Sequence, residues 1–116
     1  MSSQPLLCFD YKNVYPYLTD KKIDIKPYII PSILSNWDHS PRSGKKGVIL
    51  VNSNPANFKK HLINVFDIVK EKDIEKQYIF LKSWNEWGEG NYMEPDSIYG
   101  DQYIKTLRSV LDDYKK

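Results

Sequence analysis

The feature that most constrains the fold is an alternation of strand-like and helix-like segments along the chain. Residues 26–34 and 78–81 are short apolar runs rich in β-branched and aromatic side chains, which is typical of buried strands. A polar loop and then a segment with apolar residues at helical spacing follow each run. Because consecutive strand–loop–helix units imply parallel strands, the sequence predicts an α/β fold with two such units, 26–72 and 77–116.

Both helical segments carry recognisable start signals. Asn54 is in the N-cap position before Pro55, and proline is favoured as the first helical residue. Apolar side chains then recur at helical spacing through about residue 71. Asp101 is in a position to cap the second helix, whose apolar stripe consists of Tyr103, Ile104, Leu107, Val110, Leu111 and Tyr114.

The remaining segments are predicted to be less regular. Pro31 lacks an amide donor, so the first strand must end or bulge there. Residues 47–51 favour a short further strand, whereas residues 71–76 are charged and typical of a solvated turn. Residues 1–27 are expected to be irregular, apart from a strand end at 7–9.

The length and composition of the chain indicate a single small domain, 1–116. Its 116 residues are close to the commonest domain size, and a hydrophobic fraction of 41% is sufficient for a small core. The net charge of +2 comes from scattered bases, which does not favour a nucleic-acid partner, and no apolar run is long enough for a transmembrane segment. Cys8 is the only cysteine, which excludes an internal disulfide. We expect it to be a small core residue rather than a nucleophile.

The first residues of the chain also help to predict the cellular compartment of the protein. The first ten residues lack the charged start and apolar centre of a signal peptide. Together with the single cysteine, this predicts a cytoplasmic location. His39 and His61 are too far apart to form a zinc-binding pattern, and no metal or other cofactor is predicted. His61 lies beside the apolar stripe of the first helix and is expected to be structural or exposed.

An acidic, aromatic segment after the second strand is the main candidate for a functional site. Residues 83–102 hold five acids and no lysine or arginine, in a chain with 17 basic residues. Trp84, Trp87, Glu86 and Glu89 lie within seven positions. Aromatic rings stack on the C–H faces of sugars, and carboxylates bind hydroxyl groups or transfer protons, so the pattern is typical of a sugar site. The alternative interpretation is a solvated surface loop without a ligand.

A second polar loop follows the first strand. It contains Trp37, Asp38, His39 and Arg42, which form a second candidate patch. The alternative is a surface pair between Asp38 and Arg42 with His39 exposed. In parallel sheets, functional loops lie beyond the carboxyl ends of the strands, and both patches have this position in the predicted fold. This agreement is the main physical argument for a site.

A long motif runs from the second strand into the acidic segment: Phe80-Leu81-Lys82-Ser83-Trp84-Asn85-Glu86-Trp87-Gly88-Glu89-Gly90, followed by Met93-Glu94-Pro95-Asp96 and Tyr99-Gly100. It resembles the signature of the WbsX-like family, glycosyltransferases of lipopolysaccharide and capsule biosynthesis. Other stretches fit the same family: Phe9-Asp10-Tyr11, Asn36-Trp37-Asp38-His39-Ser40-Pro41-Arg42, and Asn54-Pro55 with Phe58. The family is similar in turn to endo-α-mannanase-type glycoside hydrolases, which are (β/α)8 barrels.

The resemblance implies roles for individual residues. In the related hydrolases two glutamates three positions apart perform the chemistry, and Glu86 and Glu89 occupy those positions. Glu86 would be the base-like residue at the 2-hydroxyl group of the sugar, and Glu89 the general acid/base at the glycosidic oxygen. Residues three apart face the same side in a turn but not in a strand, and Gly88 and Gly90 favour a turn. The implied sugar-binding residues are Trp37, Asp38, Arg42, Trp84, Asn85, Trp87, Tyr92 and Glu94.

The resemblance also implies an architecture and partners. A complete barrel needs about 200 residues or more, so the chain resembles only the C-terminal portion of one, with about two βα units. Its open strand edges favour self-association. The implied ligand is a sugar or a polysaccharide precursor. Glycosyl transfer is the leading prediction; glycoside hydrolysis and a non-catalytic glycan-binding remnant are the alternatives.

Overall fold

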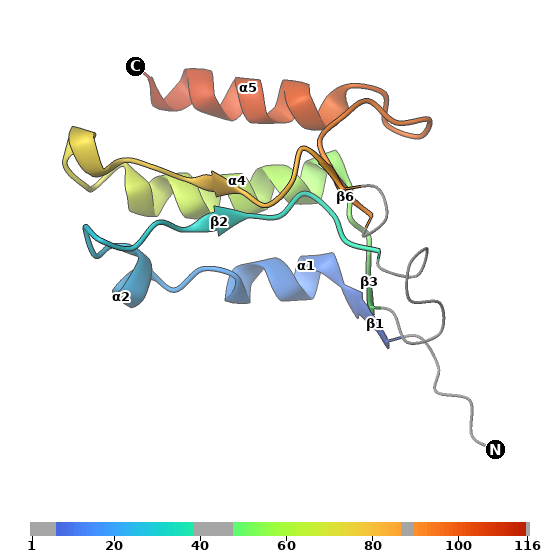
Figure 1. Ribbon diagram of the computed structural model, residues 1–116, viewed down its shortest axis with the longest axis horizontal. Coiled ribbons are helices and arrows are strands. Elements are labelled where there is room, and N and C mark those ends of the chain that lie inside the picture. Colours follow the sequence, from blue (N-terminus) through green and yellow to red (C-terminus); the bar gives the residue numbers. More distant parts are fainter. Residues whose placement is uncertain (1–6, 39–47, 87–89, 116) are drawn as a thin grey trace.

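The chain has a mixed α/β fold in which two long helices pack beside short strands (Figure 1). The computed structural model describes residues 7–38, 48–86 and 90–115. The long helices are α4 (Pro55–Val69) and α5 (Gln102–Tyr114), and they lie against each other. None of the helices in these described ranges is long and apolar enough to cross a membrane.

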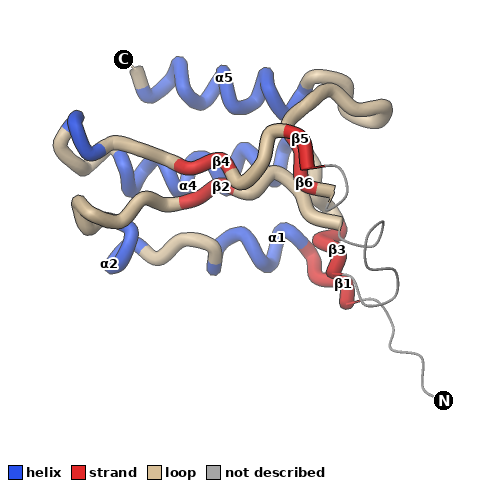
Figure 2. Tube along the Cα trace, viewed as in Figure 1, coloured by secondary structure: helices blue, strands red, loops and turns tan. Residues whose placement is uncertain are grey.

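The strands that the sequence predicted within residues 26–34 and 78–81 pair with each other in parallel, as expected. β2 (Ser32–Ile33) pairs with β4 (Phe80–Leu81), and the chain between them forms another strand and then α4. β1 (Leu7–Asp10) pairs in parallel with β3 (Val48–Val51). The described strands form three two-stranded sheets. Figure 2 shows β2 and β4 side by side, with α4 behind them and α5 along one side. The α/β class is therefore confirmed.

Both central strands are shorter than predicted. Only Ser32–Ile33 of the run 26–34 is a strand, since residues 26–28 lie in a turn and residues 29–31 are irregular. Pro31 precedes the strand, and its carbonyl oxygen accepts the Phe80 N–H at 2.9 Å. Tyr28 is 75% exposed, so the prediction that this whole run is buried on both faces is wrong.

The hydrophobic core lies between α4, α5 and the β2–β4 pair. Helix α4 begins as predicted, because the Asn54 Oδ1 accepts the Asn57 N–H at 2.8 Å and Pro55 is the first helical residue. Asp101 precedes α5 but makes no capping hydrogen bond; its carboxylate pairs with the Lys105 ammonium at 3.4 Å, so the predicted cap is wrong. The buried core residues are Ile33, Phe58, Leu62, Val65, Phe66, Val69, Met93, Tyr103 and Val110.

The N-terminal segment is more regular than predicted. After β1 the chain forms α1 (Tyr11–Val14), η1 (Tyr15–Tyr17) and α2 (Lys21–Asp24). Tyr11 is fully buried, and its hydroxyl donates to the Leu34 carbonyl at 2.6 Å, which ties this segment to the chain after β2. Cys8 is exposed on β1, so the expectation that it is a core residue is wrong.

Two polar residues on or next to α4 are buried against the N-terminal part of the chain. The His61 Nε2 accepts the Leu34 N–H at 3.2 Å, so this histidine is structural. Lys72 lies in the segment predicted to be a solvated turn, yet it is buried and its ammonium donates to the Ile29 carbonyl at 2.6 Å. The turn continues into η3 (Ile74–Lys76).

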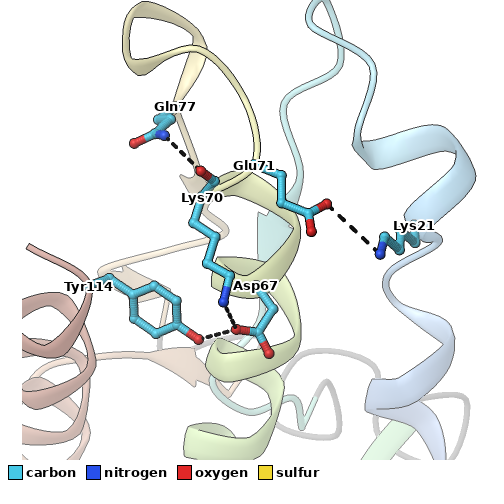
Figure 3. A network of polar contacts seen from close by, with 6 residues as sticks. All are labelled: Lys21, Asp67, Lys70, Glu71, Gln77 and Tyr114. Carbon is cyan, nitrogen blue, oxygen red and sulfur yellow. Dashed lines mark hydrogen bonds and ion pairs between the residues drawn. The ribbon is translucent and has the colours of Figure 1, made fainter.

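A network of polar contacts joins the C-terminal end of α4 to its neighbours (Figure 3). The Asp67 carboxylate accepts a hydrogen bond from the Tyr114 hydroxyl of α5 and pairs with the Lys70 ammonium at 3.2 Å. Glu71 pairs with Lys21 of α2 at 3.8 Å. These contacts lie at the opposite end of α4 from β3, so they stabilise helix packing at the end of the fold away from the candidate site (Figure 1).

Candidate functional site

The loops that follow β2 and β4 meet at one end of the molecule (Figure 1). After β4 the chain forms a hairpin, in which β5 (Asn85–Glu86) pairs antiparallel with β6 (Asn91–Tyr92). The register sets Asn85 opposite Tyr92 and Glu86 opposite Asn91. The hairpin lies beyond the carboxyl ends of β2 and β4, so the described parts of the two candidate patches occupy the same end of the fold (Figure 2).

Buried hydrogen bonds join the two loops. The Asn36 Oδ1 accepts the Tyr92 N–H at 2.9 Å, and the Asn91 Nδ2 donates to the Asn36 carbonyl at 2.7 Å. The Ser35 hydroxyl donates to the Tyr92 carbonyl at 2.7 Å. Ser35 and Asn91 are fully buried, and Asn36 is 5% exposed. Because unpaired polar groups are costly to bury, these bonds hold the hairpin against the loop after β2.

Gly90 places the hairpin backbone directly on Asp38. Its φ of +56° is in the left-handed region that favours glycine. A Cβ atom at this position would lie 2.6 Å from the Asp38 carbonyl oxygen, which is too close for any other residue without movement. The Trp37–Asp38 segment is also held by β3, because the Trp37 carbonyl accepts the Leu50 N–H at 2.8 Å and Asp38 forms a β-bridge with Ile49.

The structure places most of the predicted site residues on these two loops. Trp37 and Asp38 lie after β2, and the other described members lie on or next to the hairpin: Trp84, Asn85, Glu86, Tyr92 and Glu94. Arg42, Trp87 and Glu89 lie outside the described residues, and so does His39. The predicted turn between Glu86 and Glu89 is therefore also outside the described part of the chain.

Two of the tryptophans predicted to bind sugar, Trp37 and Trp84, lie within the described residues. Trp84 is 50% exposed, and its carbonyl accepts the Met93 N–H at 2.8 Å, which fixes the residue to the strand across the hairpin. An exposed ring on a fixed backbone is suited to stacking on the apolar face of a sugar. Trp37 is partly buried, and the Lys82 ammonium lies 5.8 Å from its ring centroid, within cation–π range.

The loop between the hairpin and α5 is shaped by Asp96. Its Oδ1 accepts the N–H groups of Ile98 at 2.8 Å and Tyr99 at 2.6 Å, and its backbone exchanges two hydrogen bonds of 3.0 Å with Gly100. Burial and the nearby Asp96 carboxylate raise the pKa of the Tyr92 hydroxyl. Tyr92 thus remains a neutral hydrogen-bonding group at neutral pH. Among the described residues, no group of three His, Cys, Asp or Glu side chains is arranged to hold a metal ion.

Tyr103 of α5 connects the hairpin to the core. Its ring contacts Tyr92 at 6.2 Å between centroids and Phe58 of α4 at 5.6 Å, both edge-on. Burial raises the pKa of the Tyr103 hydroxyl well above its usual value. Since Met93, the next residue after β6, is also fully buried, the base of the hairpin is part of the hydrophobic core.

Sequence reasoning missed the residues that hold the two loops together. Asn36 and Asn91 stand next to predicted sugar-binding residues but received no role, and Gly90 was assigned only to a turn. The available signal was the position of each asparagine directly beside an aromatic residue of a candidate patch. This signal does not distinguish a buried amide from a solvated one, because asparagine is common in exposed loops.

Comparison with known proteins shows to which family the chain belongs. The family model described as Glycosyltransferase WbsX matches residues 2–107. The uncharacterized proteins WxcX of Xanthomonas campestris pv. campestris strains B100 and ATCC 33913 are each 29% identical to the chain over 84 residues. This match covers 72% of the chain but only 12% of the length of these curated relatives. No solved structure matches the chain significantly. Because the family match extends over almost the whole sequence, the chain belongs to the glycosyltransferase WbsX family.

Proposed function

We propose that the chain is part of a glycosyltransferase of surface polysaccharide biosynthesis, such as that of lipopolysaccharide, and that its sugar site lies on the loops after β2 and β4. Family membership supports the transfer of a sugar. The observation that carries the location is the anchoring of the β5–β6 hairpin to Asn36. This anchoring holds Trp37 and Asp38 at the same end of the fold as Trp84 and Glu86, which is the combination of rings and carboxylates that a sugar requires.

The proposed chemistry uses Glu86 and Glu89 as a carboxylate pair. Glycosyl transfer needs one carboxylate near the anomeric carbon and one that moves a proton at the transferring oxygen. In this proposal Glu86 takes the proton of the sugar 2-hydroxyl as the 2-oxygen forms a bond to the anomeric carbon, and it returns the proton when the acceptor oxygen displaces the 2-oxygen from that carbon. Glu89 gives its proton to the oxygen that leaves the anomeric carbon, and then takes the proton of the acceptor hydroxyl that replaces it. The residues proposed to bind the sugar precursor are Trp37, Asp38, Arg42, Trp84, Asn85, Trp87, Tyr92 and Glu94.

We further propose that 1–116 is a single domain, part of a (β/α)8 barrel whose other βα units cover the open strands. The parallel pairing of β2 with β4 around α4 supports this architecture. Large apolar side chains are exposed on two strands: Phe80 of β4 is 59% exposed and Phe9 of β1 is 49% exposed. When the 116-residue chain is alone in solution, a second copy takes the place of the other units at these edges. The single cysteine favours a cytoplasmic location.

The catalytic part of the proposal is tested with three substitutions. Glu86→Gln keeps the shape of the side chain but removes the base, so it should abolish sugar transfer from labelled donors while glycan binding on an array persists. Trp84→Ala should weaken glycan binding. Tyr17→Ala is the matched control, because Tyr17 is an aromatic residue that is 88% exposed on η1, outside both loops. Full transfer activity in the Glu86→Gln protein would exclude the proposed role of this carboxylate.

A second candidate function is glycan binding without catalysis, which the exposed Trp84 ring favours. In that case Trp84→Ala weakens binding to the array, but no labelled donor gives product with the wild-type chain. Hydrolysis is distinguished from transfer by the fate of the label, because a hydrolase releases the sugar into water and a transferase delivers it to an acceptor.

Self-association is tested by light scattering over a range of protein concentrations. The proposal predicts that the mass of the wild-type chain rises with concentration. Phe80→Lys places a charge on the open face of β4 and should restore the monomer. A wild-type chain that stays monomeric at every concentration and melts cooperatively would contradict the proposed strand pairing between copies.

A further inference from the structure

We propose that Asn36, Asn91 and Gly90 are positioning residues that join the two sugar-binding loops into one rigid surface. None of them is assigned to the sugar itself. The inference rests on the proposed function in one respect. The joined loops fix the placement of Asp38 relative to Glu86, and this placement affects activity only if both residues act on a sugar. Its structural content is independent of that function and can be measured without a sugar.

The first step of the argument concerns the backbone of Tyr92. Its N–H donates to the Asn36 Oδ1 and its carbonyl accepts from the Ser35 hydroxyl, so both polar backbone groups are satisfied by side chains of the other loop. In a sheet, a neighbouring strand would provide these partners. The side chains of Ser35 and Asn36 therefore replace a third strand at the outer edge of the hairpin, where Tyr92 belongs to β6.

The second step is that the connection is reciprocal. The Asn91 Nδ2 donates back to the Asn36 carbonyl at 2.7 Å, and both asparagines are buried. Two consecutive hairpin residues thus bond to one residue of the other loop. Opposed hydrogen bonds of this kind fix both the distance between the loops and their register, because a shift of one residue would break all of them.

The third step concerns the contact at Gly90. Its position in the left-handed region and the 2.6 Å that would separate an added Cβ from the Asp38 carbonyl leave no space for a side chain between the two loops. Gly100 provides a contrast, because its φ of +59° is almost the same but an added Cβ would meet no atom within 4 Å. The requirement for glycine at residue 90 therefore comes from the contact between the loops as well as from the backbone angle.

Together these contacts determine the relative placement of the two acidic groups. Glu86 stands opposite Asn91 in the hairpin register, and Asp38 is two residues after Asn36. A sugar bound by the loop after β2 is then presented to Glu86 at a fixed distance. Such fixed placement is what catalysis of group transfer requires, because a loosely held partner loses most of the advantage of proximity.

Two isosteric substitutions provide a matched test. Asn91→Asp removes the donor that bonds to the Asn36 carbonyl, whereas Asn36→Asp keeps an oxygen that can accept the Tyr92 N–H. Both place one negative charge in the same buried region, but the new carboxylate meets the Asn36 carbonyl in Asn91→Asp and the Tyr92 N–H in Asn36→Asp. Gly90→Ala and Gly100→Ala form a second pair with the same change in nearly the same backbone conformation.

The readout is hydrogen exchange of the Tyr92 amide, divided by that of the Phe66 amide in the core of α4 to remove global effects. We expect this ratio to rise about tenfold or more in Asn91→Asp and Gly90→Ala, and less than about threefold in the two controls. Unchanged ratios in folded Asn91→Asp and Gly90→Ala proteins would overturn the inference. If neither variant folds, the wild-type chain decides: a Tyr92 amide that exchanges as fast as in an unstructured peptide overturns it, and strong protection supports it.

Glycan affinity tests the positioning role separately. On the array glycan that binds the wild-type chain best, Asn91→Asp should lose about tenfold in affinity while Asn36→Asp loses clearly less. A changed exchange ratio with unchanged affinity would reduce these residues to a structural role and overturn the positioning claim. If the proposed function fails, no glycan binds to any of the proteins, and the exchange ratios still decide whether the two loops are joined as inferred.

Discussion

Mild acid is expected to destabilise the chain through His61. This residue is fully buried on α4, and its Nε2 accepts the Leu34 N–H, so the ring must be unprotonated at that nitrogen. Protonation would break the bond and place a charge between the rings of Tyr11 and Tyr15, whose centroids lie 6.3 Å and 6.2 Å from that of His61. Burial accordingly lowers the pKa of His61 from 6.5 to about 4.

The sign and size of the effect follow from proton linkage. Above pH 6.5 neither state binds the proton at His61, so the stability contributed by the neutral ring is fully present. Between pH 6.5 and about 4 the unfolded chain binds a proton that the folded chain does not, and stability is lost as pH falls. For the pKa of about 4, the expected loss relative to pH 7.5 is about 1.4 kcal/mol at pH 5.5.

The assay is urea unfolding followed by tryptophan fluorescence at about pH 7.5 and about pH 5.5, a window in which carboxylates with ordinary pKa values change little. His61→Gln should remove the pH dependence, because an amide oxygen can accept the Leu34 N–H without titrating. His39→Gln is the matched control, since it removes the other histidine of the chain and should leave the dependence intact. A wild-type free energy of unfolding that is equal at the two pH values would refute the reasoning.

Three further outcomes are expected. Leu62→Ala should lower the free energy of unfolding by about 3 kcal/mol or more, whereas Ile63→Ala, on the outer face of α4, should cost less than about 1 kcal/mol; equal losses in urea titrations would contradict the assigned core. Tyr114→Phe should raise the pKa of Asp67, which the Tyr114 hydrogen bond lowers, and an unchanged carboxyl titration by NMR would argue against that bond. Lys72→Met should cost about 1–3 kcal/mol in the same urea assay, since the partly buried Ile29 carbonyl loses its donor, and a neutral result would mean that water replaces the ammonium.

The parts of the fold that depend on local signals could be predicted from the sequence. The start of α4 is an example, because Asn54 and Pro55 act on the neighbouring backbone whatever the rest of the chain does. The parallel pairing of β2 with β4 followed from the order of strands and helices. Strand length could not be predicted, since it depends on which neighbours are present. An apolar run such as 26–34 forms a strand only where another strand provides its hydrogen bonds, and here that is limited to Ser32–Ile33.

The candidate site could likewise be predicted only in part from the sequence. Trp84 and Glu86 stand out in the sequence because large rings and acids are unusual together in a loop, and the topology locates that loop at the carboxyl ends of the strands. Asn36 and Asn91 do not stand out. They are 55 residues apart, and nothing in either neighbourhood indicates that the two side chains are buried against each other. Only the tertiary structure distinguishes them from solvated loop residues.

There is a physical reason why the amides of Asn36 and Asn91, rather than apolar side chains, join the hairpin to the loop after β2. Apolar contacts tolerate sliding, because their energy depends on buried area and little on direction. A slip of one residue in a hairpin, however, turns every side chain to the opposite face, and for β5 this would move Glu86 away from its present side. The Asn36 Oδ1 accepts the Tyr92 N–H only in the observed register. The buried amides therefore add to the packing of Met93 a directional constraint on the position of β6, and β6 is the strand that pairs with Glu86 across the hairpin.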